Sequence, residues 1–178
     1  MVHRCSQVVL LIVLVGSIQV AACGGAEKVV KECEPAKTAR VTLAAGERLN
    51  PDDQGRALPT VVRLYQLTDL AKVETAEFED IWLRAPETLE KDLVKHDEMT
   101  LYPGKTEVKT VEVGGDVKFV VAVGLFRKPA GTSWRDVWEL PAPQCGKDDK
   151  PIPPSVRFEI EDYRIERVAQ RRRAEKKP

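Results

Sequence analysis

Residues 106–126, TEVKTVEVGGDVKFVVAVGLF, carry the pattern that decides the fold class of this chain. Apolar and polar residues alternate over 106–113, with Val108 out of phase with Val111 and Val113, and a valine-rich run follows over 116–126. Alternation with a period of two is typical of a strand with one buried face, and β-branched runs favour strands over helices. The pair Gly114-Gly115 predicts a two-residue hairpin between the two segments. The stretch therefore indicates antiparallel β-structure.

Further strand-like segments lie on both sides of this stretch. They are residues 38–45, 60–67 (TVVRLYQL), 133–140 (SWRDVWEL) and 156–165. Turn-forming residues separate them at 50–55 and 102–105, and a proline-rich segment does so at 141–154. About seven short strands at this spacing predict an antiparallel β-sandwich.

One interval, at about residues 74–96, follows a helical period instead. Phe78, Ile81 and Trp82 recur at the spacing of one helix face, with charged residues between them. An apolar stripe of this kind predicts amphipathic helices. We expect two short helices laid on the sandwich, so the predicted fold class is all-β with a small α addition.

The N-terminal residues resemble a bacterial lipoprotein signal. Residues 1–22 have a basic start, an apolar run and small residues before Cys23, and the run is too short for a transmembrane helix of about 20 residues. In Val20-Ala21-Ala22-Cys23 the cysteine would receive lipid and become the mature N-terminus; the alternative is an ordinary cleaved signal with an incidental Cys23. We predict a signal peptide at 1–22 and a lipidated tether at 23–36.

The charges of the mature chain are almost balanced. Residues 1–22 hold one arginine and no acidic residue, so 27 basic and 28 acidic side chains remain. This balance favours neither nucleic acid nor an anionic surface. Basic residues gather in a tail at 169–178, which either is solvated or touches phosphate or an acidic partner. The sandwich domain is expected over 37–168.

Two cysteines remain after Cys5 leaves with the signal and Cys23 takes lipid. Cys33 and Cys145 then share a compartment that permits oxidation, so we predict a disulfide between them. Two free thiols are the alternative.

Residues that carry catalysis are scarce in the mature chain. His96 is its only histidine and Ser133 and Ser155 are its only serines, which leaves little for a Ser-His-Asp site or a zinc site. The acidic pairs Asp52-Asp53 and Asp148-Asp149 lack the ligand spacing of a calcium loop. We expect no enzyme activity, no metal and no cofactor beyond the covalent lipid.

Several short motifs follow one another in a distinctive order. After the lipid-attachment motif come 49–52 (LNPD), 63–67 (RLYQL), the aromatic helix at Phe78, Leu89 with Asp92-Leu93, 102–104 (YPG) and a strand over 121–127 that ends in Phe126-Arg127. This order resembles the type VI secretion lipoprotein family, TssJ, also called SciN or VasD. The resemblance covers nearly the whole mature chain.

The resemblance implies a fold and a role. The fold is a transthyretin-like sandwich of two four-stranded antiparallel sheets with a small helical addition. Members of the family sit in the outer membrane facing the periplasm and bind the periplasmic C-terminal domain of the inner-membrane protein TssM, within a complex with TssL. Gly24, where an aspartate would favour inner-membrane retention, agrees with an outer-membrane location.

The resemblance also suggests a partner-binding loop. In the family the loop between the first two strands is implicated in partner binding, and its counterpart is 46–58. The candidate residues are Arg48, Asn50, Asp52, Asp53 and Arg56. A plain connector is the alternative. The two cysteines, the 141–154 segment and the basic tail lie outside the family pattern.

Two other functions remain open from sequence. A periplasmic carrier or cell-wall-binding lipoprotein would use sheet aromatics to line a cleft and would expose Trp134 or Trp138. A cell-wall hydrolase would need one carboxyl group with a raised pKa beside a second, and no spacing selects such a pair.

Overall fold

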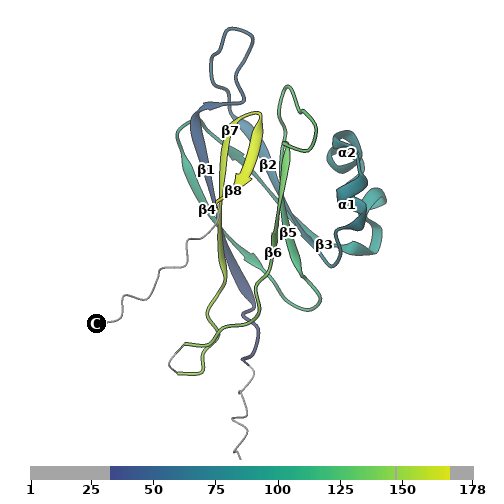
Figure 1. The fold of residues 1–178 in the computed structure, drawn as a ribbon, viewed down its shortest axis with the longest axis vertical. Helices are drawn as coiled ribbons and strands as arrows, with labels where there is room; N and C mark the ends of the chain where they lie inside the picture. Colours follow the sequence, from purple (N-terminus) through teal and green to yellow (C-terminus); the bar gives the residue numbers. More distant parts are fainter. Residues whose placement is uncertain (1–32, 147, 169–178) are drawn as a thin grey trace, which may run out of the picture. The chain divides into compact units, whose positions relative to one another are not determined.

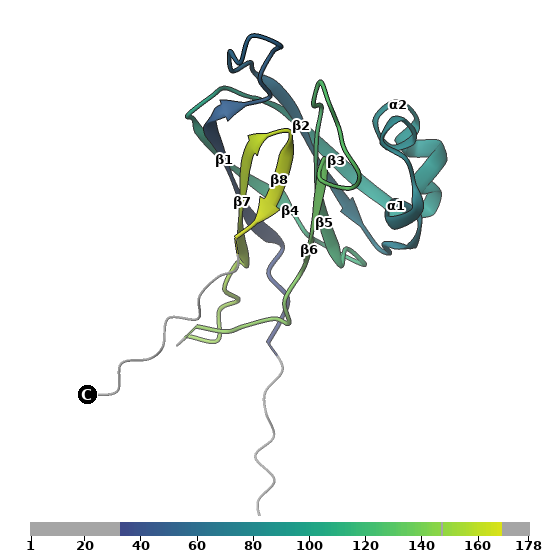
Figure 2. The same ribbon diagram turned by 45° about the horizontal axis from the view of Figure 1, so that its top comes forward.

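The computed structural model of the chain describes residues 33–146 and 148–168. Cys23, the predicted signal peptide, most of the predicted tether and the basic tail lie outside the described residues. The described residues form two four-stranded sheets that face each other, with two helices beside one of them (Figures 1 and 2). The predicted sandwich with a small α addition is confirmed.

The first sheet has the strand order β4-β1-β7-β8. Its strands are β1 (Thr38–Leu49), β4 (Thr106–Glu112), β7 (Ser155–Asp162) and β8 (Arg164–Arg167). β1 pairs with β7 in parallel, and the other neighbours are antiparallel. This sheet is therefore mixed, and the expectation that both sheets are antiparallel is wrong for it. The run predicted over 156–165 is two strands, because the chain reverses at Asp162, whose φ is 50°.

The second sheet has the order β3-β2-β5-β6 and is antiparallel throughout. Its strands are β2 (Thr60–Leu67), β3 (Leu93–Leu101), β5 (Phe119–Gly124) and β6 (Arg135–Glu139). The central strands β2 and β5 are buried on both faces, which explains their near-continuous apolar sequence.

The predicted hairpin at Gly114-Gly115 is wrong. β4 pairs with β1 and β5 pairs with β2, so the chain crosses from one sheet to the other between them. Burial decides this pairing. β5 is buried along most of its length and lies between β2 and β6, whereas β4 has mostly exposed residues and forms an edge.

The helices cover the outer face of the second sheet. They are α1 (Ala71–Thr75) and α2 (Phe78–Leu89), followed by the 3₁₀ turn η1 (Glu90–Asp92). The Tyr65 hydroxyl donates to the Ile81 carbonyl at 3.0 Å, and the Arg63 guanidinium lies 3.9 Å from the centre of the Trp82 ring. These contacts from β2 hold α2 on the sheet.

The helical interval ends earlier than the sequence predicts. It stops at Asp92, and β3 begins at Leu93 and includes His96. Only Leu101 is buried among the nine residues of this edge strand, so its sequence carries no period of two that would reveal it.

The sandwich has two distinct ends. The loop end carries the connections 50–59, 102–105 and 125–134 and the turn at Asp162, and the disulfide end carries residues 33–37 and 140–154. β1 runs from the disulfide end to the loop end (Figure 1). The chain therefore enters the sandwich at the end opposite the candidate loop.

Candidate functional site

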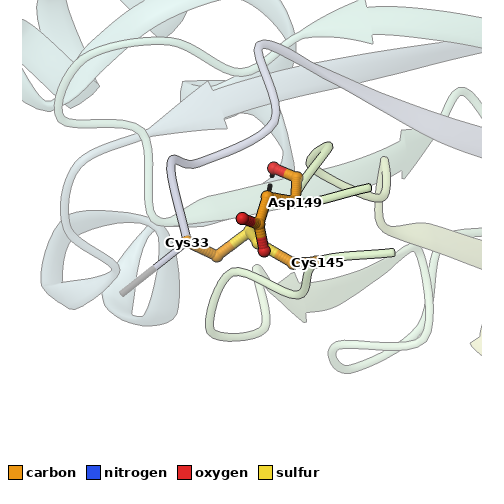
Figure 3. Close-up of a disulfide and its surroundings, with 3 residues drawn as sticks. All are labelled: Cys33, Cys145 and Asp149. Carbon is orange, nitrogen blue, oxygen red and sulfur yellow. Dashed lines mark hydrogen bonds between the residues drawn. A yellow bond between two sulfur atoms is a disulfide. The ribbon is translucent and has the colours of Figure 1, made fainter. Parts of the chain in front are cut away.

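Cys33 and Cys145 are joined in a disulfide at the disulfide end (Figure 3). Their Cα atoms lie 5.7 Å apart. Cys145 belongs to a small turn in which the Gly146 amide donates to the Lys150 carbonyl at 2.9 Å. The predicted pairing is confirmed, and it ties the start of the described chain to the segment between β6 and β7.

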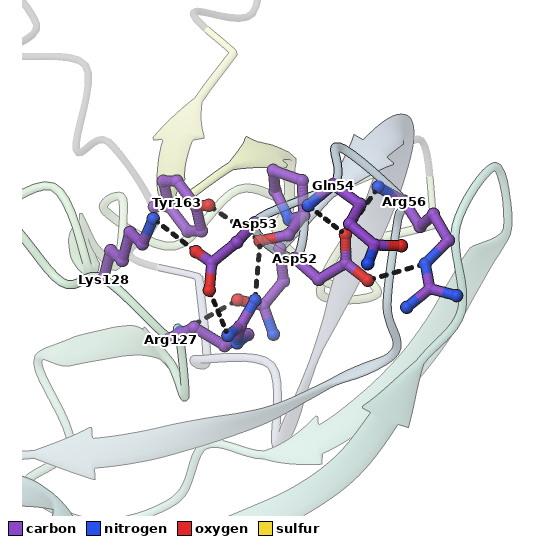
Figure 4. Close-up of polar contacts among 9 residues, drawn as sticks. Asp52, Asp53, Gln54, Arg56, Arg127, Lys128 and Tyr163 are labelled. Carbon is purple, nitrogen blue, oxygen red and sulfur yellow. Dashed lines mark hydrogen bonds and ion pairs between the residues drawn. The ribbon is translucent and has the colours of Figure 1, made fainter.

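Asp52 braces the candidate loop from within (Figure 4). Its Oδ1 accepts hydrogen bonds from the amides of Gln54 and Arg56, both at 2.9 Å, and its Oδ2 lies 2.7 Å from Nε of Arg56. The hydrogen bond from the Arg56 amide is the largest cause that lowers the pKa of Asp52. The loop is therefore a closed turn held by its own residues.

Asp53 ties this loop to the β5–β6 connection. Nζ of Lys128 lies 2.8 Å from its carboxylate and Nη2 of Arg127 lies 3.4 Å away, and the hydrogen bond from Lys128 leads the causes that lower the pKa of Asp53. The turn after β7 joins the same group, because the Tyr163 hydroxyl donates to the Pro51 carbonyl at 2.7 Å. Three connections distant in sequence are thus fastened together (Figure 4).

The lowered pKa values give the loop a defined pH dependence. A carboxyl group whose pKa is lower in the folded than in the unfolded chain stabilises the folded state above the unfolded pKa. For Asp52 and Asp53 this contribution is present above a pH of about 4 and is lost as the pH falls further.

Asn50 supports the loop from beneath. Asn50 is 4% exposed and its φ is 44°. Its Oδ1 accepts a hydrogen bond from the Arg127 amide at 2.9 Å. Asparagine tolerates this left-handed conformation better than most residues. Its side chain fixes the path of the loop by holding the Arg127 amide.

We expect Asn50→Ala to lower the free energy of unfolding by about 1–2 kcal/mol, because it removes the acceptor of the part-buried hydrogen bond from the Arg127 amide and because alanine tolerates the positive φ less well than asparagine does. Urea denaturation of the mature chain measures this loss. Asn50→Gly is the matched control, since glycine removes the hydrogen bond but accepts the backbone conformation. Equal stability of wild type and both variants would show that Asn50 does not support the loop.

The other candidate residues differ in exposure. Arg48 lies in β1 rather than in the loop, and its exposed guanidinium is 2.9 Å from Asp162. Arg56 and Asp53 are exposed, with 72% and 71% of their side chains accessible, whereas the Asp52 side chain is mostly covered at 13%. Arg48, Asp53 and Arg56 can therefore reach a partner directly.

The residues of the 50–58 loop and the side chains that contact them form one polar cluster. The sequence did not predict three of its members, which are Arg127, Lys128 and Tyr163. The sequence predicts that a strand ends in Phe126-Arg127, but β5 ends at Gly124, so Arg127 lies in the β5–β6 connection beside Asp53. The separation of 74 residues between Asp53 and Arg127 leaves no local signal for the pair.

A groove borders the residues around Asp53, and the charged groups that line it are engaged with one another. The groove has a volume of about 830 Å³ and is lined by residues that include Arg48, Pro51, Asp53, Lys128 and Tyr163. Among the described residues, no group of three or more His, Cys, Asp or Glu side chains could hold a metal ion. Within the same residues, no helix is both long enough and apolar enough to cross a membrane.

Comparison with known proteins gives one family and several related folds. A family model described as type VI secretion lipoprotein, VasD, EvfM, TssJ matches residues 37–163. The T6SS lipoprotein TssJ1 from Pseudomonas aeruginosa is 25% identical, with a TM-score of 0.67 over 76% of this chain and 98% of that chain. No curated protein matches the sequence.

Two further solved structures share the fold at lower identity. Serratia marcescens Lip, a membrane bound component of the type VI secretion system, is 17% identical, with a TM-score of 0.66 over 74% of this chain and 97% of that chain. A chain in the structure of the T6SS protein TssM C-terminal domain from EAEC is 22% identical, with a TM-score of 0.61 over 75% of this chain and 99% of that chain.

Proposed function

The chain belongs to the type VI secretion lipoprotein family, and from that premise we propose that it anchors a type VI secretion membrane complex to the outer membrane. In this proposal the lipid on Cys23 inserts in the outer membrane. The loop end binds the periplasmic C-terminal domain of TssM, which acts within a complex with TssL. The observation that carries the proposal is the family match, which extends from residue 37 to residue 163 and so includes β1 through β7.

The position of the loop end supports this arrangement. Cys23 precedes Cys33 by ten residues, which span at most roughly 35 Å, so a lipid anchor would keep the disulfide end near the membrane. The twelve residues of β1 extend over roughly 40 Å from that end toward the loop end. The braced loop is then presented to a partner on the periplasmic side.

Burial of the tryptophans weighs against a carrier or cell-wall-binding lipoprotein. That alternative needs an exposed aromatic platform, but Trp134 and Trp138 are 3% and 6% exposed. Trp134 packs edge-on against Phe78 of α2 at 5.4 Å. Both rings belong to the core.

The acidic groups weigh against a hydrolase. A general acid needs a raised pKa, whereas in the described residues the carboxyl groups with a resolved shift, Asp52 and Asp53, have lowered values. Each is paired with a cation at the surface. A binding role is compatible with carboxylates that are ionised and paired, as Asp52 and Asp53 are.

Replacement of Asp52, Asp53 and Arg56 together by alanine is expected to weaken binding to the TssM periplasmic domain by about tenfold or more. The change removes two exposed charged groups and the carboxylate that closes the turn. Isothermal titration of the TssM domain with the mature, unlipidated chain measures the effect.

A matched control changes the same kinds of charge elsewhere. Glu79, Glu87 and Lys91 are exposed on α2 and η1, so their triple alanine variant alters two acids and one base away from the loop end. We expect this control to bind as wild type does. Full affinity of the loop variant, with unchanged circular dichroism, would remove the loop from the binding site.

A further inference from the structure

A row of apolar residues lies beside the charged loop at the loop end. Tyr102 follows β3, Pro59 precedes β2, and Leu125 follows β5. Tyr102 is 56% exposed and Leu125 is 36% exposed, and both are among the large apolar side chains that the described surface leaves open.

Strand pairing brings the three positions together. Thr60 of β2 is the pairing partner of Leu101, the residue before Tyr102. On the other side of β2, the Leu125 amide donates to the Val61 carbonyl at 2.8 Å, and the Thr60 hydroxyl donates to the Leu125 carbonyl at 2.5 Å. Neighbouring strands lie about 4.8 Å apart, so Tyr102 and Leu125 are separated by roughly 10 Å across the sheet. Leu125 lies opposite Val61, two residues farther along β2 than Pro59.

The row faces outward from the sandwich. Leu101, Thr60 and Gly124 are buried, whereas the side chains of Tyr102 and Leu125, which follow β3 and β5 directly, are accessible. The helices do not cover this end: α2 makes its contacts with Arg63 and Tyr65, farther along β2. The row is continuous with the limb of the loop that leads from Arg56 to β2.

This composition is that of an interface centre with a polar rim. Single exposed apolar residues are ordinary, but a contiguous row beside exposed charged groups is less so. Protein interfaces combine an apolar centre with a polar rim, and tyrosine and arginine are over-represented among the residues that dominate binding. A tyrosine ring also loses little rotational freedom on binding, because it has two side-chain torsions.

We propose that Tyr102 and Leu125 form the apolar centre of the partner-binding surface, and that the loop carrying Asp53 and Arg56 forms its polar rim. This inference rests on the proposed function, and its occupant is the TssM periplasmic domain. The proposal requires the partner to offer an apolar depression for the Tyr102 ring.

Titration of the TssM periplasmic domain with variants of the mature, unlipidated chain tests the proposal. Tyr102→Ala is expected to weaken binding about 30-fold, the factor that corresponds to the loss of a dominant interface residue, and Leu125→Ala several-fold. Tyr102→Phe keeps the ring and is expected to bind within a few-fold of wild type. Leu83→Ala is the control, because Leu83 is 70% exposed on α2, outside the row, and its loss is expected to leave binding unchanged.

The outcomes separate this inference from the proposed function. If the triple loop variant binds weakly while Tyr102→Ala and Leu125→Ala bind as wild type does, the apolar centre is wrong and the anchoring role stands. If the wild-type chain does not bind the TssM domain, both proposals fail. Thermal unfolding identifies any variant that loses affinity through misfolding, and Leu125→Gln then serves as a second probe from another strand.

Discussion

A Cys23→Ser chain is expected to leave the outer membrane and to stop supporting type VI secretion, while its sandwich folds and binds its partner as before. Each buried methylene of an acyl chain contributes about 0.8 kcal/mol to membrane attachment, and several chains together give a durable anchor. Cys23 lies ten residues before the first described residue, Cys33, and outside the strands and helices of the described sandwich. This separation of attachment from folding makes the expected effect large and specific.

Membrane fractionation and a secretion assay measure this effect in cells that carry the variant as their only copy. Cys5→Ser is the matched control, because Cys5 lies in the predicted signal peptide and is absent from the mature chain. Normal secretion by the Cys23→Ser chain, with the protein recovered in the soluble periplasm, would remove the lipid anchor from the mechanism.

The second large effect is expected from loss of the disulfide. Cys33 and Cys145 are 112 residues apart. In the chain-entropy account, closing a loop of this length lowers the entropy of the unfolded chain and so raises the free energy of unfolding by about 4–5 kcal/mol. The Cys33→Ser, Cys145→Ser double variant is expected to unfold roughly 15 °C below wild type in calorimetry. The double variant is preferable to either single one because it leaves no unpaired thiol.

Wild-type chain in excess reductant provides the control for the two serine substitutions. Its melting temperature is expected to fall to that of the double variant. If neither reduction nor substitution lowers the melting temperature, the bridge contributes nothing to stability and the chain-entropy argument does not apply here.

Strand identity was predictable where one face or both faces of a strand are buried. The segments around β2, β5 and β6 carry that signal in their apolar residues. β3 gave no such signal, because it is an edge strand whose residues are mostly accessible. Strand pairing was harder still: Gly114-Gly115 describes the chemistry of a local turn, whereas the sheet that β5 joins is decided by contacts with β2 and β6.

In the candidate site, too, the local features were predictable from the sequence and the contacts between distant segments were not. A polar turn at 50–55 follows from its Asn, Pro, Asp and Gly residues, and the bracing of Asp52 by Arg56 is local to that turn. The contact of Asp53 with Lys128 depends on the packing of two connections that are distant in sequence. Which side chains are exposed also follows from packing, as the burial of Asn50 illustrates.

The disulfide has a mechanical consequence for an anchored protein. A pull that arrives through the N-terminal segment reaches Cys33 and divides there, one part passing along the backbone into β1 and the other through Cys145. From Cys145 the chain continues in one direction to β6 and in the other to β7, which belong to different sheets. Tension is thereby shared by both layers of the sandwich, and β1 is not peeled away from its neighbours alone.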